Sequence, residues 1–129
     1  MVVFRCRRQV RRRLGAELGI AGGAHGLHIN KENGSQEFLY LCDQARGQVF
    51  KTDLAGKVVW QRGVPDANGL YANPGEYHPT NVAIHNDTLF IADGYGKSWI
   101  HIYDTERQLQ EVLRRPGQRA RQSSAARTA

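Results

Sequence analysis

A six-residue pattern that occurs twice constrains the fold of this chain more than any other feature. The first copy, residues 38–43, reads FLYLCD, and the second copy, residues 88–93, reads TLFIAD. Each copy leads on to a further apolar run that ends in aspartate, at residues 49–53 and 100–104. The aspartates that close the two copies, Asp43 and Asp93, are 50 residues apart. A period of this length is typical of repeat architectures.

Around each copy, short apolar runs alternate with turn signals. We expect strands at residues 25–29, 38–42, 48–52, 58–61, 80–84, 88–92 and 99–103. Tight turns or loops are predicted between them at residues 33–34, 46–47, 55–57, 85–87 and 94–98. Four antiparallel strands joined by polar turns form one blade of a β-propeller. A two-layer sandwich is the rival fold, but its strands need not repeat in sequence. We therefore predict an all-β chain, a β-propeller fragment of about two four-stranded blades.

Composition divides the chain into three parts. The predicted blades occupy residues 20–106, with repeat one at about 24–62 and repeat two at about 78–106. Residues 63–78 form a long connection with three glycines and two prolines, on the face where repeat proteins place their binding loops. Residues 1–19 and 107–129 do not continue the repeat, so we expect them to be irregular.

The net charge of +6 is unevenly distributed. Residues 24–104 hold six Lys and Arg against nine Asp and Glu, and the two ends hold the other 12 basic residues, all arginine, with three acids. Ends rich in Arg, Ala, Gly, Ser and Gln are typical of GC-rich DNA translated out of frame, which is our hypothesis. Solvated tails or a nucleic-acid-binding arm are alternatives. Phosphate-binding arms usually mix Lys with Arg, so we expect no nucleic-acid partner.

Several classes are excluded by what the sequence lacks. No run of about 18 apolar residues exists, so no membrane-spanning helix and no membrane partner are expected. The arginines near the N-terminus have no apolar stretch behind them, so they do not form a complete secretory signal. Cys6 and Cys42 lack CxxC spacing and are predicted to be free thiols.

His25 is a candidate metal ligand, because neutral imidazole is a common zinc ligand and the adjacent glycines leave it room to project. His28 should point to the opposite side of the same strand, so the two would not share a metal. No histidine lies at HxH or HxxxH spacing from another, so a structural or surface role for His25 stays open.

Tyr95 lies between two glycines in the sequence Asp93-Gly94-Tyr95-Gly96, directly after a predicted buried strand. An exposed phenol there could act as an acid or base, or the residue could simply pack or cap the loop. Asp43 and Asp93 occupy equivalent positions, and such aspartates usually fix turns by accepting backbone hydrogen bonds.

Three strings carry a resemblance to a known family: HGL at residues 25–27, HPTNVA at 78–83 and IADGYGKS at 91–98. They resemble the NHL-repeat β-propellers, and within them the peptidyl-α-hydroxyglycine α-amidating lyases and their bacterial relatives. The resemblance implies a six-bladed propeller with zinc in the central channel and a calcium ion. It also implies cleavage of a peptidyl-hydroxyglycine into a peptide amide and glyoxylate.

By this resemblance His25 matches a zinc ligand, Leu27 the residue whose backbone carbonyl binds calcium, and Tyr95 the catalytic tyrosine. The zinc would act as a Lewis acid. His78 and Asp93 are further candidate binding residues.

The chain also departs from the family. Two further zinc histidines, a calcium-binding aspartate and a catalytic arginine have no matching motif. The family's disulfide would join positions 77 and 96, which are Tyr77 and Gly96 here. The ligand set is therefore incomplete, and we expect the chain to be inactive alone.

Three functions follow as hypotheses. The first is a lyase-like metalloenzyme. The second is a non-catalytic propeller that binds a protein through residues 63–78 or binds a small ligand. The third is a lactonase-like, metal-dependent propeller. Open blade edges predict a self-associating, poorly soluble or partly molten product. The resemblance implies a secreted or periplasmic parent protein.

Overall fold

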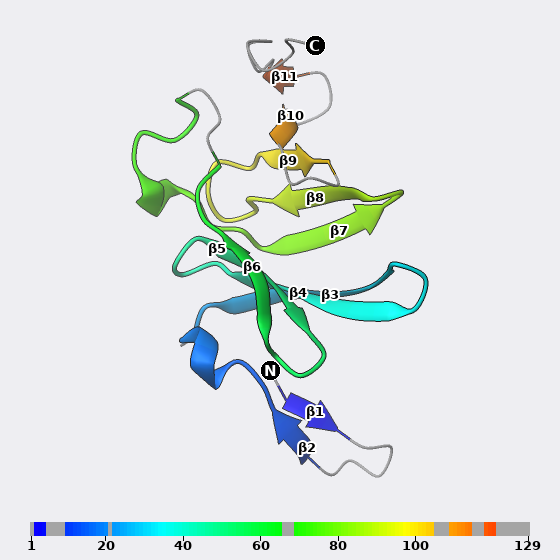
Figure 1. The fold of residues 1–129 in the computed structure, drawn as a ribbon. Helices are drawn as coiled ribbons and strands as arrows, with labels where there is room; N and C mark the ends of the chain where they lie inside the picture. The colour runs from blue at the N-terminus through cyan, green and yellow to red at the C-terminus, as the bar shows by residue number, and fades with distance from the viewer. Residues whose placement is uncertain are drawn as a thin grey trace.

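Two antiparallel β-sheets stacked face to face form most of the structure, a computed structural model (Figure 1). The structure describes residues 2–4, 10–20, 22–65, 69–104, 109–114 and 118–120. The prediction of an all-β propeller fragment is confirmed, and the fragment is not closed into a ring. Among the described residues, no helix has the length and apolar character needed to span a membrane.

Blade one is a four-stranded sheet built from the first repeat. In sheet order its strands are β3 (Ala24–Glu32), β4 (Gln36–Asp43), β5 (Gln48–Asp53) and β6 (Val58–Arg62). The β3–β4 hairpin turns at Asn33 and Gly34, with φ of 49° and 85°. Glu32 pairs with Gln36, so the predicted turn at residues 33–34 is confirmed within a three-residue loop.

Blade two is built from the second repeat. In chain order its strands are β7 (Asn81–His85), β8 (Thr88–Ala92), β9 (Ile100–Tyr103), β10 (Leu109–Arg114) and β11 (Gln118–Ala120). The β7–β8 turn again has two positive φ values, 46° at Asn86 and 60° at Asp87. His85 pairs with Thr88, so this loop has two residues, one fewer than the loop between β3 and β4.

The ends are less irregular than expected. Beyond the predicted blade strands lie β10 and β11, and the first end carries β1 (Val2–Phe4), β2 (Val10–Arg13) and the short 3₁₀ helix η1 (Ala16–Leu18). β10 extends the sheet by pairing with β9, whose edge would otherwise leave backbone groups without partners. In the two predicted ends, residues 1, 5–9, 107–108, 115–117 and 121–129, with Cys6 among them, lie outside the described residues.

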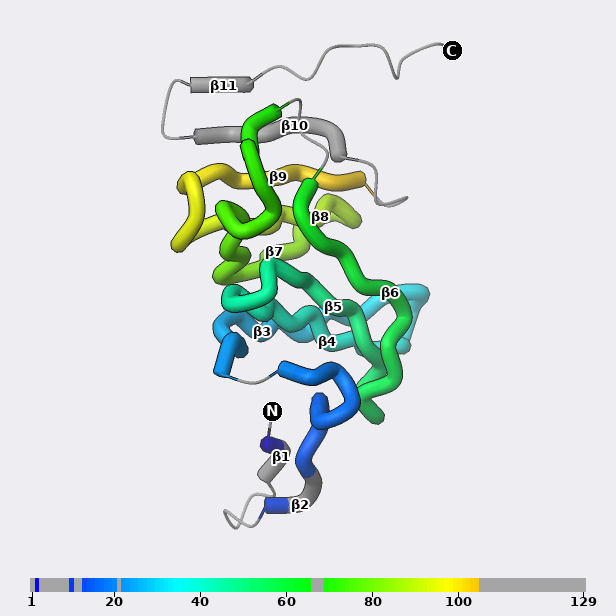
Figure 2. Tube along the Cα trace, turned by 90° about the vertical axis from the view of Figure 1, so that its left-hand side faces the viewer, coloured from blue at the N-terminus to red at the C-terminus, as the bar shows by residue number. Residues whose placement is uncertain are grey.

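The main core lies between the two blades, where β7 packs against β3 and β4 (Figure 2). Its buried residues are Phe38, Tyr40, Cys42, Val49, Tyr77, Val82, Leu89, Ile91 and Tyr103. Cys42 is a free thiol, as predicted, and burial raises its pKa to about 12. Gly26 permits the close approach, because a Cβ there would lie 2.4 Å from the Thr80 carbonyl oxygen.

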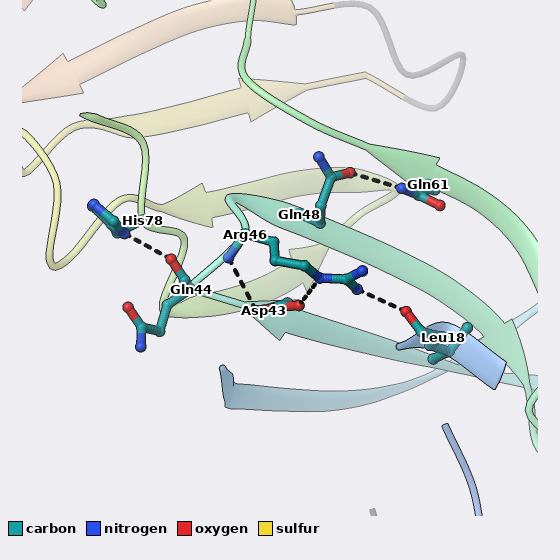
Figure 3. Close-up of polar contacts among 7 residues, drawn as sticks. All are labelled: Leu18, Asp43, Gln44, Arg46, Gln48, Gln61 and His78. Carbon is teal, nitrogen blue, oxygen red and sulfur yellow. Dashed lines mark hydrogen bonds and ion pairs between the residues drawn. The ribbon is translucent and has the colours of Figure 1, made fainter. Parts of the chain in front are cut away.

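The opposite face of blade one is partly covered by residues 14–20, which we call the arm. Leu18 and Ile20 of the arm pack against Leu41 and Phe50 of the sheet. Arg46 holds the arm in place, because its guanidinium donates a 2.7 Å hydrogen bond to the carbonyl of Leu18 (Figure 3). The arm therefore belongs to the fold of blade one.

Candidate functional site

Two of the residues singled out from the sequence lie together at the junction of the blades. His25 lies at the start of β3, and Tyr95 lies in the loop between β8 and β9, 70 residues further along the chain. The imidazole Nε2 is 3.2 Å from the Tyr95 hydroxyl oxygen. The two rings meet edge to face, with centroids 5.0 Å apart. The fold thus brings the candidate zinc ligand and the candidate catalytic tyrosine into direct contact.

The backbone of Thr80 determines where the proton of His25 lies. The His25 Nδ1 is 2.8 Å from the Thr80 carbonyl oxygen. A carbonyl can only accept, so Nδ1 carries the hydrogen and donates it. In the neutral imidazole Nε2 is then the acceptor, and the Tyr95 hydroxyl donates to it. Metal-binding histidines typically anchor their second nitrogen on a carbonyl in this way, so Nε2 is prepared to act as a ligand.

Thr80 is the residue that sequence reasoning missed. Its carbonyl accepts from His25, and its hydroxyl accepts a 3.2 Å hydrogen bond from the backbone N–H of Gly94. A Cβ on Gly94 would come within 2.4 Å of that hydroxyl oxygen. Thr80 therefore positions both partners of the His25–Tyr95 pair, although only its place in the HPTNVA string marked it.

The pair itself is open to solvent. Tyr95 is 65% exposed, and His25 is also exposed. Such a site is accessible to a ligand, whereas the hydrogen bonds of Thr80 that support it are partly buried.

Asp93 and Asp43 fix turns, as their equivalent positions predicted. Asp93 accepts 2.8 Å hydrogen bonds from the backbone N–H groups of His78 and Lys97. Asp43 accepts from the backbone N–H and from Nε of Arg46, at 3.2 Å and 2.6 Å (Figure 3). Both aspartates are fully buried. The carboxylate oxygens of Asp93 are thus engaged within the protein, and its proposed part in ligand binding stays a prediction.

His78 links the two blades. Its Nδ1 donates a 2.7 Å hydrogen bond to the carbonyl of Gln44, in the turn after β4 (Figure 3). With its backbone N–H bound to Asp93, His78 connects the turns that follow the two equivalent strands β4 and β8. The contacts are structural, and a role in ligand binding stays untested.

Leu27, the predicted source of a calcium-binding carbonyl, lies at a bulge in the pairing of β3 with β4. β3 is an edge strand of its sheet, and the Leu27 side chain is 49% exposed. Within the described ranges, no group of three or more His, Cys, Asp or Glu side chains is placed to hold a metal ion.

A second histidine, His101, forms a buried chain that the sequence did not reveal. The Tyr71 hydroxyl donates to Asp93 Oδ2 at 2.8 Å, and the same hydroxyl oxygen is 2.7 Å from His101 Nε2. Because the tyrosine proton is directed at Asp93, Nε2 must carry a hydrogen and donate it to Tyr71. Burial lowers the pKa of His101 to about 4, although the charge of Asp93 opposes the shift. Burial, and next the hydrogen bond to Asp93, raise the pKa of Tyr71 above its usual range.

Comparison with known proteins adds no family to these observations. No protein-family model matches the chain, and no curated protein matches it. The function must therefore be argued from the residues and their geometry.

Proposed function

We propose that the chain is part of an NHL-type propeller with a metal-assisted lyase site, similar to the peptidyl-α-hydroxyglycine lyases. The observation that carries the proposal is the hydrogen-bonded chain from the Thr80 carbonyl through His25 to the Tyr95 hydroxyl. The motif resemblance selects His25 and Tyr95 separately, from different blades. Their contact is what a shared site requires.

The donor set fits one ligand position of a zinc site. His25 presents Nε2 as an acceptor while its Nδ1 is held by a carbonyl. Catalytic zinc takes about three protein ligands, so the others would come from outside the described residues. When bound, the zinc would supply Lewis-acid chemistry at the substrate. The Leu27 carbonyl would hold the calcium ion.

Tyr95 would move a proton during the reaction. Cleavage of a peptidyl-α-hydroxyglycine breaks the bond between the α-carbon and the amide nitrogen. The α-hydroxyl loses its proton and becomes the aldehyde oxygen of glyoxylate, and the amide nitrogen gains a proton. An exposed phenol in contact with a histidine can carry that proton between the two positions.

Zinc titration followed by NMR tests the metal part of this proposal. We expect zinc to shift or broaden the ring signals of His25 and Tyr95 before those of His78 and His85. In Tyr95→Phe the His25 signals should still respond, whereas His25→Ala should remove the response at Tyr95. An equal response of all exposed histidines would show that zinc binds without selection.

The chemical part is tested by glyoxylate release. The rate from a peptidyl-α-hydroxyglycine is compared for zinc alone, for zinc with the chain, and for zinc with His25→Ala or Tyr95→Phe. Because the ligand set of this chain is incomplete, we expect at most a small rise over zinc alone, and a rise that is lost in both variants supports the lyase proposal. Hydrolysis of a lactone under the same conditions would favour a lactonase-like site.

A non-catalytic binding propeller is the alternative, and the connection between the blades favours it. Residues 72–75 are exposed, and Glu76 fixes them by accepting a 2.7 Å hydrogen bond from the backbone N–H of Ala72. Lys97 holds Glu76 through a 3.0 Å ion pair. On this alternative, His25→Ala leaves ligand binding unchanged, and Glu76→Ala weakens it.

A further inference from the structure

Strand pairing identifies equivalent positions in the two blades. In blade one, Leu27 pairs with Leu41 and Ile29 pairs with Leu39. In blade two, Val82 pairs with Ile91 and Ile84 pairs with Leu89. Because residues 38–43 match residues 88–93 in sequence, Leu27 is equivalent to Val82, and Ile29 is equivalent to Ile84.

Equivalent positions differ in how they are covered. Val82 is 3% exposed, and Ile84 packs against the core between the blades. Leu27 and Ile29 are 49% and 55% exposed. We call these two residues the front patch. The front patch is apolar. It occupies the positions in blade one that are equivalent to those by which blade two packs on blade one, yet it remains exposed.

Val82 is covered by a face of blade one, and blade two has a face that is equivalent to it. On blade one this surface includes Tyr40, which pairs with Lys51, and Cys42, which pairs with Val49. The equivalent pairs in blade two are Phe90 with Ile102 and Ala92 with Ile100. We call these four residues the rear patch. Ile100 is 40% exposed, and the other three are partly exposed. The chain therefore carries both halves of a blade-to-blade contact, one on each outer face.

We propose that copies of this chain associate head to tail, with the front patch of one copy packed on the rear patch of the next, and that the contact closes a ring. Two different patches meet in such a contact, so it is heterologous and builds either a ring or a filament. The contact joins inner strands as the packing of blade two on blade one does, and in propellers such packing leads to closure at about four to eight blades. Closure therefore takes two to four copies. The proposal is independent of the zinc site.

The arm covers only part of this face of blade one. Its Leu18 and Ile20 cover Leu41 and Phe50, in β4 and β5, but not the front patch on β3. A cavity of about 490 Å³ lies on this side of the sheet, and Leu27 lines it together with Leu14 of the arm, Val2 of β1 and Arg13 of β2. Within the chain, β3 and β4 are the strands of blade one that contact β7. The open part of the face is thus at the inner strand, where the blades already meet.

Light scattering coupled to size-exclusion chromatography tests the proposal on the 129-residue chain. We expect one discrete mass, corresponding to two, three or four copies. Ile29→Lys removes the front patch and Ile100→Lys removes the rear patch, so each variant alone should be a monomer. Mixed in equal amounts, they retain one intact front and one intact rear patch and should form a heterodimer. Leu54→Lys, at a turn residue that is 48% exposed, is the matched control and should leave the wild-type mass unchanged.

Each outcome decides for or against the ring. A wild-type monomer, or a mass that grows without limit with concentration, overturns it. Two monomers that stay separate on mixing would exclude a head-to-tail contact. Far-ultraviolet circular dichroism verifies that each variant keeps its strands, and Ile29→Ser with Ile100→Ser replaces any lysine variant that loses them.

Discussion

Two tyrosine–histidine pairs within the described residues use the same groups in opposite surroundings. In the first pair, Tyr95 donates to Nε2 of His25, and both residues are exposed. In the second pair, Nε2 of His101 donates to Tyr71, and His101 is fully buried. The direction of each hydrogen bond is set by a third group.

The third group explains the difference between the pairs. A neutral carbonyl orients His25 and leaves its outer nitrogen as an acceptor, which suits a metal or a substrate proton. The Asp93 carboxylate takes the proton of Tyr71, and the chain ends at a buried His101 Nδ1 without a hydrogen-bond partner among the described residues. Burial makes the second pair a structural element, so residue type alone does not identify a site.

Removal of the Asp93 carboxylate, which orients the buried Tyr71–His101 pair, should have the largest effect on stability. Asp93→Ala leaves the backbone N–H groups of His78 and Lys97 and the Tyr71 hydroxyl without their acceptor. We expect the free energy of unfolding to fall by about 4 kcal/mol, measured by urea denaturation. Asp43→Ala, which frees only groups of Arg46, should cost about half as much on the same basis. Equal losses would contradict the role given to Tyr71.

The pH dependence of stability tests the burial of His101. The pKa of His101 is about 4 in the folded protein against 6.5 for an ordinary histidine, so the unfolded chain binds more protons between these values. Stability from this group is complete above pH 6.5 and is lost as the pH falls toward 4. The loss should reach about 3 kcal/mol in urea denaturation at a series of pH values.

His101→Gln should remove this part of the pH dependence, because the amide N–H₂ can still donate to Tyr71 and does not titrate. A profile in His101→Gln parallel to that of the wild type would assign the transition to carboxylates instead.

A side chain at position 26 tests whether the close approach of the two blades holds His25 in place. In Gly26→Ala the new Cβ meets the Thr80 carbonyl oxygen and Asn81 Cα, at 2.4 Å and 2.7 Å, so the strands must separate. We expect a loss of about 2 kcal/mol in the free energy of unfolding, together with loss of the His25–Thr80 hydrogen bond seen by NMR. Gly75→Ala is the control, because its Cβ would approach only the flexible side chain of Asn73.

The smallest and most direct comparison removes one hydroxyl from each pair. Tyr71→Phe removes the hydroxyl that joins Asp93 to His101 and should cost about 1.5 kcal/mol. Tyr95→Phe removes an exposed hydrogen bond and should change stability by less than about 0.5 kcal/mol. Thermal or urea denaturation of both variants measures the difference. A larger loss in Tyr95→Phe would mean that the exposed pair holds the blades together.

The features that the sequence predicted are local ones. β8 has the predicted bounds, and the Asn33-Gly34 turn and the two turn-fixing aspartates follow from residue type and spacing. What the sequence did not reveal depends on contacts over long separations. Thr80 meets His25 across 55 positions, and Tyr71 meets His101 across 30. Neither contact leaves a periodic pattern, since each depends on how one blade lies on the other.

The proton on His25 is protected from mutation in a way that the proton on His101 is not. The group that orients His25 is a main-chain carbonyl, which every amino acid at position 80 supplies. The groups that orient His101 belong to the side chains of Tyr71 and Asp93, and a single codon change removes either one. The exposed histidine can therefore keep its tautomer while the sequence at position 80 drifts. For His101 to keep its tautomer, selection must preserve Tyr71 and Asp93 as well as His101 itself.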